Sequence, residues 1–284
     1  MNPKVAALLR EACNTIPAHE ARVLLAYAIG TLTNGAGPAD AWAWEAPDEV
    51  DTARFREYVA ARGRGVPLQY ITGVAPFRTV EVGVGPGVFV PRPETEPMTG
   101  WAIERIRGLP ADRKPVVVEL CAGSGAISLA IRWEAPGCEQ YAVEADAEAL
   151  AWARRNLSGA DVRLVHADMD GALPELDGSV DLVIANPPYI PDGDAPGLPV
   201  DVRDHEPAAA LFAGPEGLDA IRVVARVAAR LLRPGGLVAC EHGDDQGATA
   251  PQIFAEAGFD EVADHPDLAR RPRFVTARWP GMAG

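Results

Sequence analysis

A short motif with a carboxamide, two prolines and an aromatic ring follows an apolar run in this chain. The apolar run, residues 182–185, predicts a buried strand, and Asn186, Pro187, Pro188 and Tyr189 come directly after it. A planar amide or aromatic amine has a delocalised lone pair, so its N–H groups need acceptors before the nitrogen can attack an electrophilic methyl group. The Asn186 side-chain oxygen and the Pro187 carbonyl can be these acceptors, and Tyr189 can pack on a planar group. Taken alone, the motif also fits a rigid turn.

A glycine-containing loop forms the second candidate site. It follows the predicted strand Val116–Leu120 and opens a helix, and its glycines let the backbone approach a ligand closely. A dinucleotide-binding loop would have glycine at positions 121 and 128, where this chain has Cys121 and Ser128. The loop therefore favours S-adenosylmethionine over a nicotinamide dinucleotide, although two glycines alone often mark only a tight turn. Its candidate cofactor contacts are Cys121, Ala122, Gly123, Ser124 and Gly125.

Acidic residues follow the next two predicted strands. Glu144 ends the second strand, where a carboxylate can accept hydrogen bonds from both ribose hydroxyls. Asp168 follows the third strand and can accept from an adenine amino group, while Met169 can pack on the adenine ring or donate its backbone N–H. Each acid alone also fits an ordinary solvated loop residue. Their order, after the glycine loop and before Asn186, favours a single site for cofactor and substrate.

Several further segments are typical of one enzyme family. The segment at 90–96 is more specific than the Asn-Pro-Pro-Tyr motif, which adenine-N6 methyltransferases share. The segments are residues 67–73, 90–96, 121–126, 186–190, 201–203 with 206–207, and 241–243 with 246–247. On these residues the chain resembles the release-factor glutamine N5-methyltransferases (HemK/PrmC type), which are class I S-adenosylmethionine-dependent enzymes.

The resemblance implies an activity and a set of site residues. The implied reaction transfers a methyl group from S-adenosyl-L-methionine to the side-chain amide nitrogen of the glutamine in the Gly-Gly-Gln motif of class I peptide-chain release factors. The implied cofactor contacts are the 121–125 loop, Glu144, Met169 and Asn186. The implied substrate contacts are Asn186, Pro187, Pro188 and Tyr189, of which Asn186, Pro187 and Tyr189 are catalytic. Glu144 replaces a commoner aspartate, which keeps the ribose role, and Met169 replaces an aromatic residue found in some members.

Strands and helices alternate through most of the chain. Strands are expected at residues 116–120, 141–144, 162–166, 180–185, 237–241 and 274–279, and helices from 125 and over 147–157, 218–232 and 248–257. This alternation predicts an α/β fold with a doubly wound, mostly parallel sheet that binds ligands at the carboxyl ends of its strands. The resemblance implies a seven-stranded methyltransferase sheet.

The first part of the chain predicts small helices. Apolar residues share one face over residues 5–12 and another over 23–28, and a third helix is expected over 52–62. A loop rich in Gly, Ala and Pro is expected over 33–47, with Trp42 and Trp44 packed against some other part of the protein.

The predicted helices and strands divide the chain into three parts. Alternating valines with interspersed glycines predict a hairpin over 77–90. The expected organisation is a helical substrate-docking domain at 1–75, a hairpin linker at 76–92 and a methyltransferase domain at 93–284.

Composition limits the class of protein. The 284 residues can form two domains or one large one, and the 48% of hydrophobic residues allow a full core. Neither a membrane-spanning run nor a secretion signal is visible, so a cytoplasmic protein is expected. The net charge of −14 opposes binding to a nucleic-acid backbone. Cys13, Cys121, Cys138 and Cys240 lack metal-type spacing, so neither a disulfide nor a metal site is expected.

Charged and aromatic residues near the motifs have simpler interpretations than catalysis. Arg92, Glu94 and Glu96 can form an ion-paired hinge between the two domains. Arg203 and Glu206 can order a lid or pair with each other.

Three aromatic side chains are expected to be structural. His242 is more consistent with a structural than a catalytic role, and Trp133 and Trp152 are expected in the core or covering the sheet.

Two other functions remain open from the residues. An adenine-N6 methyltransferase acting on DNA or RNA would use the same motif at Asn186 to hold a flipped base, although the acidic composition disfavours it. A non-catalytic binding module could keep the fold as a scaffold, which the intact glycine loop and motif argue against.

Overall fold

A seven-stranded sheet forms the centre of the molecule. The computed structural model describes residues 1–31, 44, 46–110 and 113–281. The strand order is β5-β4-β3-β6-β7-β9-β8. The strands are β3 (Val116–Leu120), β4 (Glu139–Glu144), β5 (Val162–His166), β6 (Val180–Ala185), β7 (Leu232–Glu241), β8 (Asp260–Pro266) and β9 (Pro272–Arg278). The first five are parallel, and β9 and β8 add antiparallel pairs, which confirms the predicted α/β fold with a mostly parallel seven-stranded sheet.

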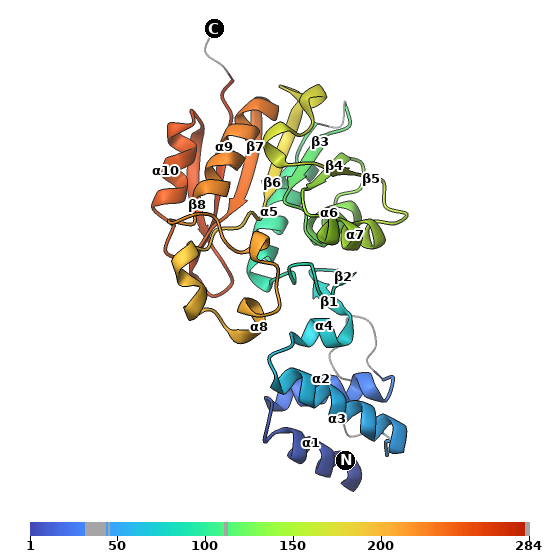
Figure 1. The fold of residues 1–284 in the computed structure, drawn as a ribbon. Helices are drawn as coiled ribbons and strands as arrows, with labels where there is room; N and C mark the ends of the chain where they lie inside the picture. Colours follow the sequence, from blue (N-terminus) through green and yellow to red (C-terminus); the bar gives the residue numbers. More distant parts are fainter. Residues whose placement is uncertain (32–43, 45, 111–112, 282–284) are drawn as a thin grey trace.

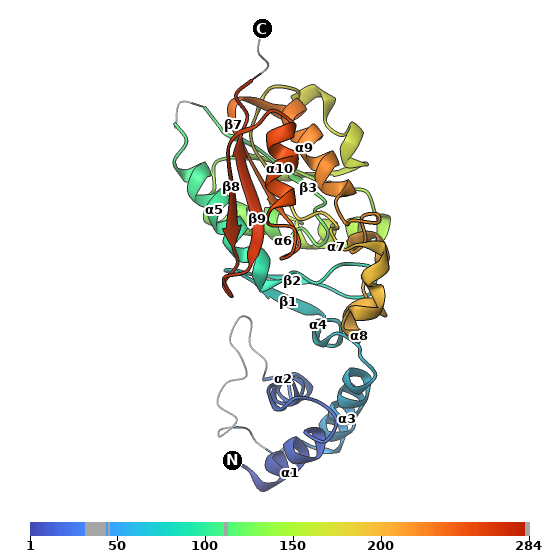
Figure 2. The ribbon, with the colours of Figure 1, turned by 90° about the vertical axis from the view of Figure 1, so that its left-hand side faces the viewer.

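Helices cover both faces of this sheet (Figures 1 and 2). They are α5 (Glu96–Arg107), α6 (Ala126–Glu134) and α7 (Ala147–Asn156) on one face, and α9 (Asp219–Leu231) and α10 (Thr249–Glu256) on the other. Every residue of β6 is buried, as expected for a central parallel strand covered on both sides. Alternate residues of β6 therefore enter different cores, with Leu182 and Ile184 packing under α5 and α6 and Val183 packing under α9. None of the helices in the described ranges is long and apolar enough to cross a membrane.

A bundle of helices at the N-terminal end has a core of its own (Figure 1). Its helices are α1 (Pro3–Ala12), α2 (Ala18–Ala28), α3 (Glu49–Gly63) and α4 (Leu68–Thr72). The predicted apolar faces meet here, where Leu8, Leu24 and Phe55 are buried together. Trp44 is buried against this core, as predicted. Trp42 and most of the predicted loop at 33–47 lie outside the described residues.

The hairpin lies earlier in the chain than predicted. β1 (Val74–Phe77) pairs antiparallel with β2 (Val80–Gly83), whereas the prediction placed the hairpin at 77–90. Its turn depends on Arg78, which takes a left-handed backbone conformation (φ 52°) without being glycine. Tertiary contacts hold it there, since the Arg78 backbone N–H donates to Glu96 at 3.0 Å and its guanidinium donates to Glu134 at 2.8 Å. Local turn signals could not reveal this position, because the partners come from distant helices.

Two elements and one tryptophan differ from the prediction. α5 was not expected, because prolines at 93 and 97 and a glycine at 100 weaken its helical pattern. β8 is an edge strand with mostly polar side chains, so it lacks the apolar run used to identify the other strands. Trp133 is 71% exposed, so its expected place in the core is wrong. Trp152 does cover other residues, because its indole N–H donates to the Pro86 carbonyl at 3.2 Å and its ring packs beside the hairpin.

A buried carboxylate joins three segments at the amino end of β6. Asp181 accepts from the guanidinium groups of Arg113 and Arg233 and from the Val116 backbone N–H at 2.8 Å. Burial acts to raise the pKa of Asp181, but these donors outweigh it, so the pKa is lowered. The ionised carboxylate is therefore part of the folded structure near neutral pH.

Asp181→Ala is expected to lower the free energy of unfolding by about 3 kcal/mol, because the Val116 N–H and the two arginines lose a shared acceptor. Urea unfolding followed by circular dichroism measures this loss. The more exposed Asp177, which pairs with Arg230, provides a matched control. Asp177→Ala should cost less than about 1 kcal/mol, and equal losses in the two variants would contradict the importance given to burial.

Candidate functional site

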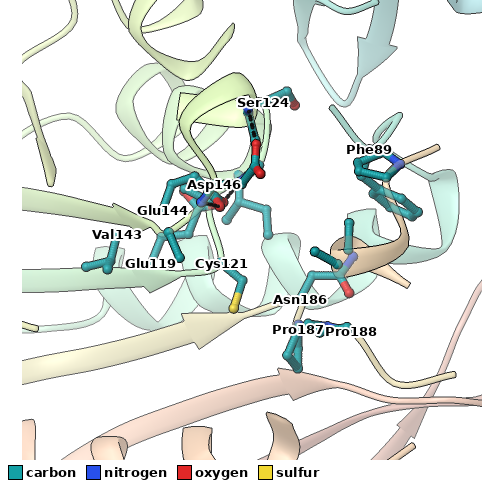
Figure 3. A pocket seen from close by; sticks show the side chains of 18 of the residues that line it. Phe89, Glu119, Cys121, Ser124, Val143, Glu144, Asp146, Asn186, Pro187 and Pro188 are labelled. Carbon is teal, nitrogen blue, oxygen red and sulfur yellow. Dashed lines mark hydrogen bonds between the residues drawn. The ribbon is translucent and has the colours of Figure 1, made fainter. Parts of the chain in front are cut away.

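The carboxyl ends of β3, β4, β5 and β6 meet at a pocket of about 420 Å³. The predicted site residues in its wall are Cys121, Ala122, Gly123, Ser124, Glu144, Asp168, Met169, Asn186, Pro187, Pro188 and Tyr189. Gly125 is the predicted site residue that does not line it. Figure 3 shows Glu144 and Asn186 on different sides of this pocket, with Phe89 beyond Asn186. The strand ends thus bring together the residues that the sequence placed in one site.

The glycine loop turns sharply between β3 and α6. Cys121, Gly123 and Gly125 have φ angles of 57°, 55° and 79°, which are left-handed conformations. The loop closes on itself through the Gly125 N–H, which donates to the Ala122 carbonyl at 2.8 Å. A Cβ atom at Gly123 would meet no atom within 4 Å, so the loop backbone borders open space there. Gly125 has a different role, because a Cβ atom there would lie 3.1 Å from Leu157 and disturb the packing of α6 against the end of α7.

The Glu144 carboxylate connects the glycine loop to the end of β4. One oxygen accepts from the Gly123 backbone N–H at 2.7 Å, and the other accepts from the Asp146 backbone N–H at 2.8 Å (Figure 3). Glu144 is therefore buried with a partner for each oxygen, and it is not the solvated acid considered as an alternative. A carboxylate oxygen can accept more than one hydrogen bond, so both oxygens can also accept from ligand hydroxyls.

Asp168 and Met169 form the pocket wall after β5. Asp168 is exposed and accepts from the Asp170 backbone N–H at 2.9 Å, which caps the short turn that follows. The Met169 sulfur lies 3.7 Å from the Cys121 sulfur, so the two side chains close one side of the pocket together. Met169 thereby presents apolar surface next to a free acceptor on Asp168.

Asn186 has a fixed partner in the opposite wall. Its Nδ2 atom donates to the Thr95 hydroxyl at 3.2 Å, which turns the Oδ1 atom away from Thr95. The Tyr189 hydroxyl donates to Glu241 at 3.1 Å. Burial, followed by the nearby Glu241 charge, raises the pKa of Tyr189 well above its ordinary value, so the phenol keeps its proton and remains a donor.

Sequence reasoning missed several wall residues. Phe89, Pro91 and Thr95 line the pocket from the segment between the hairpin and α5, and Glu119 lines it from β3. The signal for Pro91 and Thr95 was the segment at 90–96, and Phe89 directly precedes it. The role of Thr95 could not be inferred without its partner Asn186. Glu119 belongs to a strand and therefore looked like a core position.

Glu119 is a buried acid with neutral partners. It accepts from the Ser128 backbone N–H at 2.9 Å and from the Ser128 hydroxyl. Burial raises the pKa of Glu119 to about 8, and the Ser128 hydrogen bonds offset only part of this rise. The carboxyl therefore gains a proton near neutral pH when no cationic group is close to it.

The predicted pairing of Arg203 with Glu206 is not found. Glu206 does not pair with Arg203, because Arg203 pairs with its neighbour Asp204 at 2.7 Å. Glu206 is buried, accepts from both Arg92 at 2.7 Å and the Val90 backbone N–H at 3.3 Å, and so ties the loop after the motif to the 90–96 segment. The sequence could not resolve this choice, since both arginines are compatible with the same glutamate.

His242 and Gln246 support the site from behind. The His242 ring is fully buried between the Gly243 carbonyl (2.8 Å) and the Asp264 carboxylate (2.9 Å), and it does not line the pocket. The Gln246 side-chain amide donates to the Tyr189 carbonyl at 3.0 Å. These contacts agree with the structural role expected for His242.

The wall chemistry fits S-adenosylmethionine, the cofactor that the family resemblance implies. The described wall residues include Glu119, Glu144, Asp146 and Asp168 but no lysine or arginine. This distribution suits a ligand with a positive sulfonium group and without phosphates. The open space beside the loop backbone at Gly123 leaves room for a closely held ligand, and the volume lies in the usual range for small-molecule sites.

Glu119 makes a pH dependence of stability testable. Its folded pKa of about 8 lies above the ordinary value of 4.5, so its contribution to stability is complete below about pH 4.5 and is lost as the pH rises towards 8. Glu119→Gln cannot ionise, so the variant should gain stability relative to the parent protein between pH 5 and 8, by an amount on the order of a few kcal/mol. Thermal and urea unfolding of the cofactor-free proteins at several pH values measure this difference. A difference that does not change with pH would contradict the raised pKa.

Two family models match the chain. The first, described as "PrmC N-terminal domain", matches residues 4–73, and the second, described as "Methyltransferase small domain", matches residues 105–196. The first coincides with the helical bundle, and the second covers β3 to β6 with the glycine loop and the Asn186 motif.

Similar proteins cover most of this chain. A release factor glutamine methyltransferase from Streptomyces coelicolor is 53% identical over 82% of this chain and 83% of its own length. One from Mycobacterium tuberculosis is 44% identical over 96% of this chain and 89% of its own length. A 4-amino-L-phenylalanine/4-methylamino-L-phenylalanine methyltransferase from Streptomyces pristinaespiralis is 42% identical over 75% of this chain and 76% of its own length. These relatives show that the chain belongs to the release factor glutamine methyltransferase family of S-adenosyl-L-methionine-dependent enzymes.

Proposed function

We propose that this enzyme methylates the side-chain amide nitrogen (N5) of the glutamine in the Gly-Gly-Gln motif of class I peptide-chain release factors. The observation that carries the proposal is the orientation of Asn186, whose Nδ2 atom is engaged by Thr95 and whose Oδ1 atom is left to accept in the pocket. Relatives named for this substrate cover most of the chain, which supports the same assignment.

The chemistry requires two acceptors next to the reacting nitrogen. When bound, S-adenosyl-L-methionine supplies an electrophilic methyl group on a sulfonium sulfur. Asn186 Oδ1 and the Pro187 carbonyl accept the two N–H groups of the substrate amide, so that its nitrogen lone pair is directed at the methyl group. One N–H proton leaves to water after the new bond forms, because an N-methylated amide is strongly acidic until it loses that proton, and no general base is needed.

The remaining wall residues divide between the two ligands. On the cofactor side we assign the 121–125 loop, Glu144, Asp168, Met169 and Asn186. On the substrate side we assign Asn186, Pro187, Pro188 and Tyr189. Phe89, which lies beyond Asn186 in Figure 3, adds a second aromatic surface for a planar carboxamide.

The helical bundle is assigned to docking of the protein substrate. The proposed division is a docking domain at 1–75, a hairpin linker at 76–92 and a methyltransferase domain at 93–284. The separate core of the bundle supports this division. Because release factors act in translation, the proposal implies that the enzyme works in the cytoplasm.

A second acceptor class is an aromatic amine. One relative is named for methylation of 4-amino-L-phenylalanine, and such an amine shares with a glutamine amide a lone pair that is delocalised into a planar group. The net charge of −14 disfavours the adenine-N6 alternative on DNA or RNA. Membership of an enzyme family argues against the non-catalytic binding module.

A competition between acceptors tests the proposed substrate. A class I release factor, its variant with alanine in place of the motif glutamine, 4-amino-L-phenylalanine and DNA are each incubated with radiolabelled cofactor and enzyme. Label should enter the intact release factor alone, and peptide mass spectrometry should find one added methyl group on the glutamine. Preferential labelling of the amine or of DNA would refute the proposal.

Asn186→Ala should lower kcat for release factor methylation by at least about 100-fold, because one of the two amide acceptors is lost. Cofactor affinity, measured by isothermal titration calorimetry, should stay within a few-fold of the parent value, since the glycine loop and Glu144 are intact. Methyl transfer at a near-normal rate in this variant would rule out the acceptor role.

A further inference from the structure

A buried glutamate lies behind the proposed acceptor and does not line the pocket itself. Glu241 ends β7 and is almost fully buried. Its Oε1 atom accepts from the Tyr189 hydroxyl at 3.1 Å, while its Oε2 atom is buried without a hydrogen-bond partner among the described residues. A buried carboxylate with an unused oxygen is costly, so its presence next to the reaction site calls for a function.

Thr95 connects Glu241 to the acceptor amide. The Thr95 hydroxyl accepts from Asn186 Nδ2 at 3.2 Å, and its hydrogen bonding to Glu241 lowers the pKa of that carboxyl. Oε2, which has no other hydrogen-bond partner among the described residues, is the oxygen left to accept from the Thr95 hydroxyl. A hydrogen bond from Thr95 to this oxygen would join Glu241, Thr95 and Asn186 in one chain of hydrogen-bonding groups that ends in the pocket.

The direction of the hydrogen bonds in this chain follows from the donors that each group has. An ionised carboxylate can only accept, so the single Thr95 hydroxyl proton must point to Glu241. The Thr95 oxygen can then only accept from Asn186, which fixes the Nδ2 atom towards Thr95 and leaves the Oδ1 atom for the substrate. If Glu241 is neutral, its own proton can point to Thr95, and the Thr95 proton is released to point to Asn186. The Asn186 amide can then turn and present Nδ2, a donor, to an amide N–H group that needs an acceptor.

We propose that Glu241 is a positioning residue whose carboxylate, acting through Thr95, orients the Asn186 amide so that its oxygen faces the substrate nitrogen. This inference rests on the proposed function, since it assigns a use to the acceptor atom of Asn186. Turnover then requires that Glu241 be ionised, although Glu241 does not touch the substrate.

The surroundings of Glu241 determine the pH range in which it ionises. Burial raises the pKa of Glu241 to about 7, against the lowering effects of Thr95, Arg273 and Tyr189. The titratable or charged groups that face it are Tyr189, Arg273, Glu94 and Cys240. Tyr189 and Cys240 stay neutral because burial raises the pKa of each, so they do not titrate in this range. The ionised, orienting form of Glu241 therefore becomes populated as the pH rises through about 7.

The test compares Glu241→Gln, Thr95→Val and their double variant in release factor methylation. A glutamine can donate as well as accept, so Glu241→Gln should lose the fixed direction and lower kcat about 10- to 100-fold, with KM for the release factor changed less than about 3-fold. The parent kcat should rise with pH through about 7, and this rise should disappear in Glu241→Gln. The kcat of the double variant should be no lower than that of the slower single variant, because both changes break the same connection. Thr95→Ser keeps the hydroxyl, so its kcat should be close to that of the parent enzyme.

A matched control separates positioning from folding. Glu139→Gln changes another partly buried glutamate, which begins β4 at the amino end of the sheet and pairs with Arg163 at 2.8 Å. It should alter the melting temperature but leave kcat and its pH profile as in the parent enzyme. Cofactor titration calorimetry confirms that each variant is folded.

Nuclear magnetic resonance of the Asn186 side-chain amide gives a readout that needs no substrate. The signal is assigned by its absence in Asn186→Asp, and its hydrogen-bonded proton should shift and exchange faster in both Glu241→Gln and Thr95→Val. An unchanged signal, an unchanged pH profile or additive losses in the double variant would overturn the inference. Absence of release factor methylation by the parent enzyme would instead refute the proposed function, while the amide signal would still decide whether Glu241 orients Asn186.

Discussion

The parallel register of β4, β3, β6 and β7 is the constraint on which the site depends. Leu120 pairs with Val143 and Ala185, and Ala185 pairs with Cys240. The residues that follow these positions therefore come together at one edge of the sheet: Glu144 and Glu241 end β4 and β7, and Cys121 and Asn186 directly follow β3 and β6. A slip of one residue in any strand would turn its last side chain to the other face. The buried apolar residues of the strands prevent such a slip, so the core of the sheet determines the geometry of the pocket.

Carboxylates at the two ends of this sheet have different electrostatic surroundings. At the amino end, Asp181 has two arginines and a lowered pKa. At the carboxyl end, burial raises the pKa values of Glu119 and Glu241, whose direct hydrogen-bond donors are hydroxyl groups and a backbone N–H. Pairing with arginines keeps a buried carboxylate ionised. When its hydrogen-bond donors are neutral, its protonation state changes with pH or with the charge of a bound ligand. The acids at the carboxyl end are therefore suited to a site that binds a cation.

The sequence was sufficient for features that depend on local pattern. β3, β5 and β6 begin and end where predicted, because most of the residues in each are apolar and each has clear limits. The pocket residues after these strands could be predicted because parallel strands end at one edge. Thr95 and Glu241 could not, since their importance comes from contacts with Asn186 and Tyr189, which are distant in the sequence. The same reason explains the misplaced hairpin, whose turn is held by α5 and α6, and the overlooked edge strand β8.

The pocket wall also depends on the helical bundle. Arg62 of α3 pairs with Glu20 in the bundle at 2.8 Å and with Asp201 of α8 (Val200–Arg203) at 3.3 Å. The loop that contains α8 continues to Glu206, which is held by Arg92, and then lines the pocket from Pro207 to Leu211. Since this loop is bound to the bundle at one point and to the 90–96 segment at another, its position is set jointly by both parts of the molecule. A protein substrate docked on the bundle, as we propose, would contact the same framework that supports this wall of the pocket, and its recognition would then be connected physically to the reaction site.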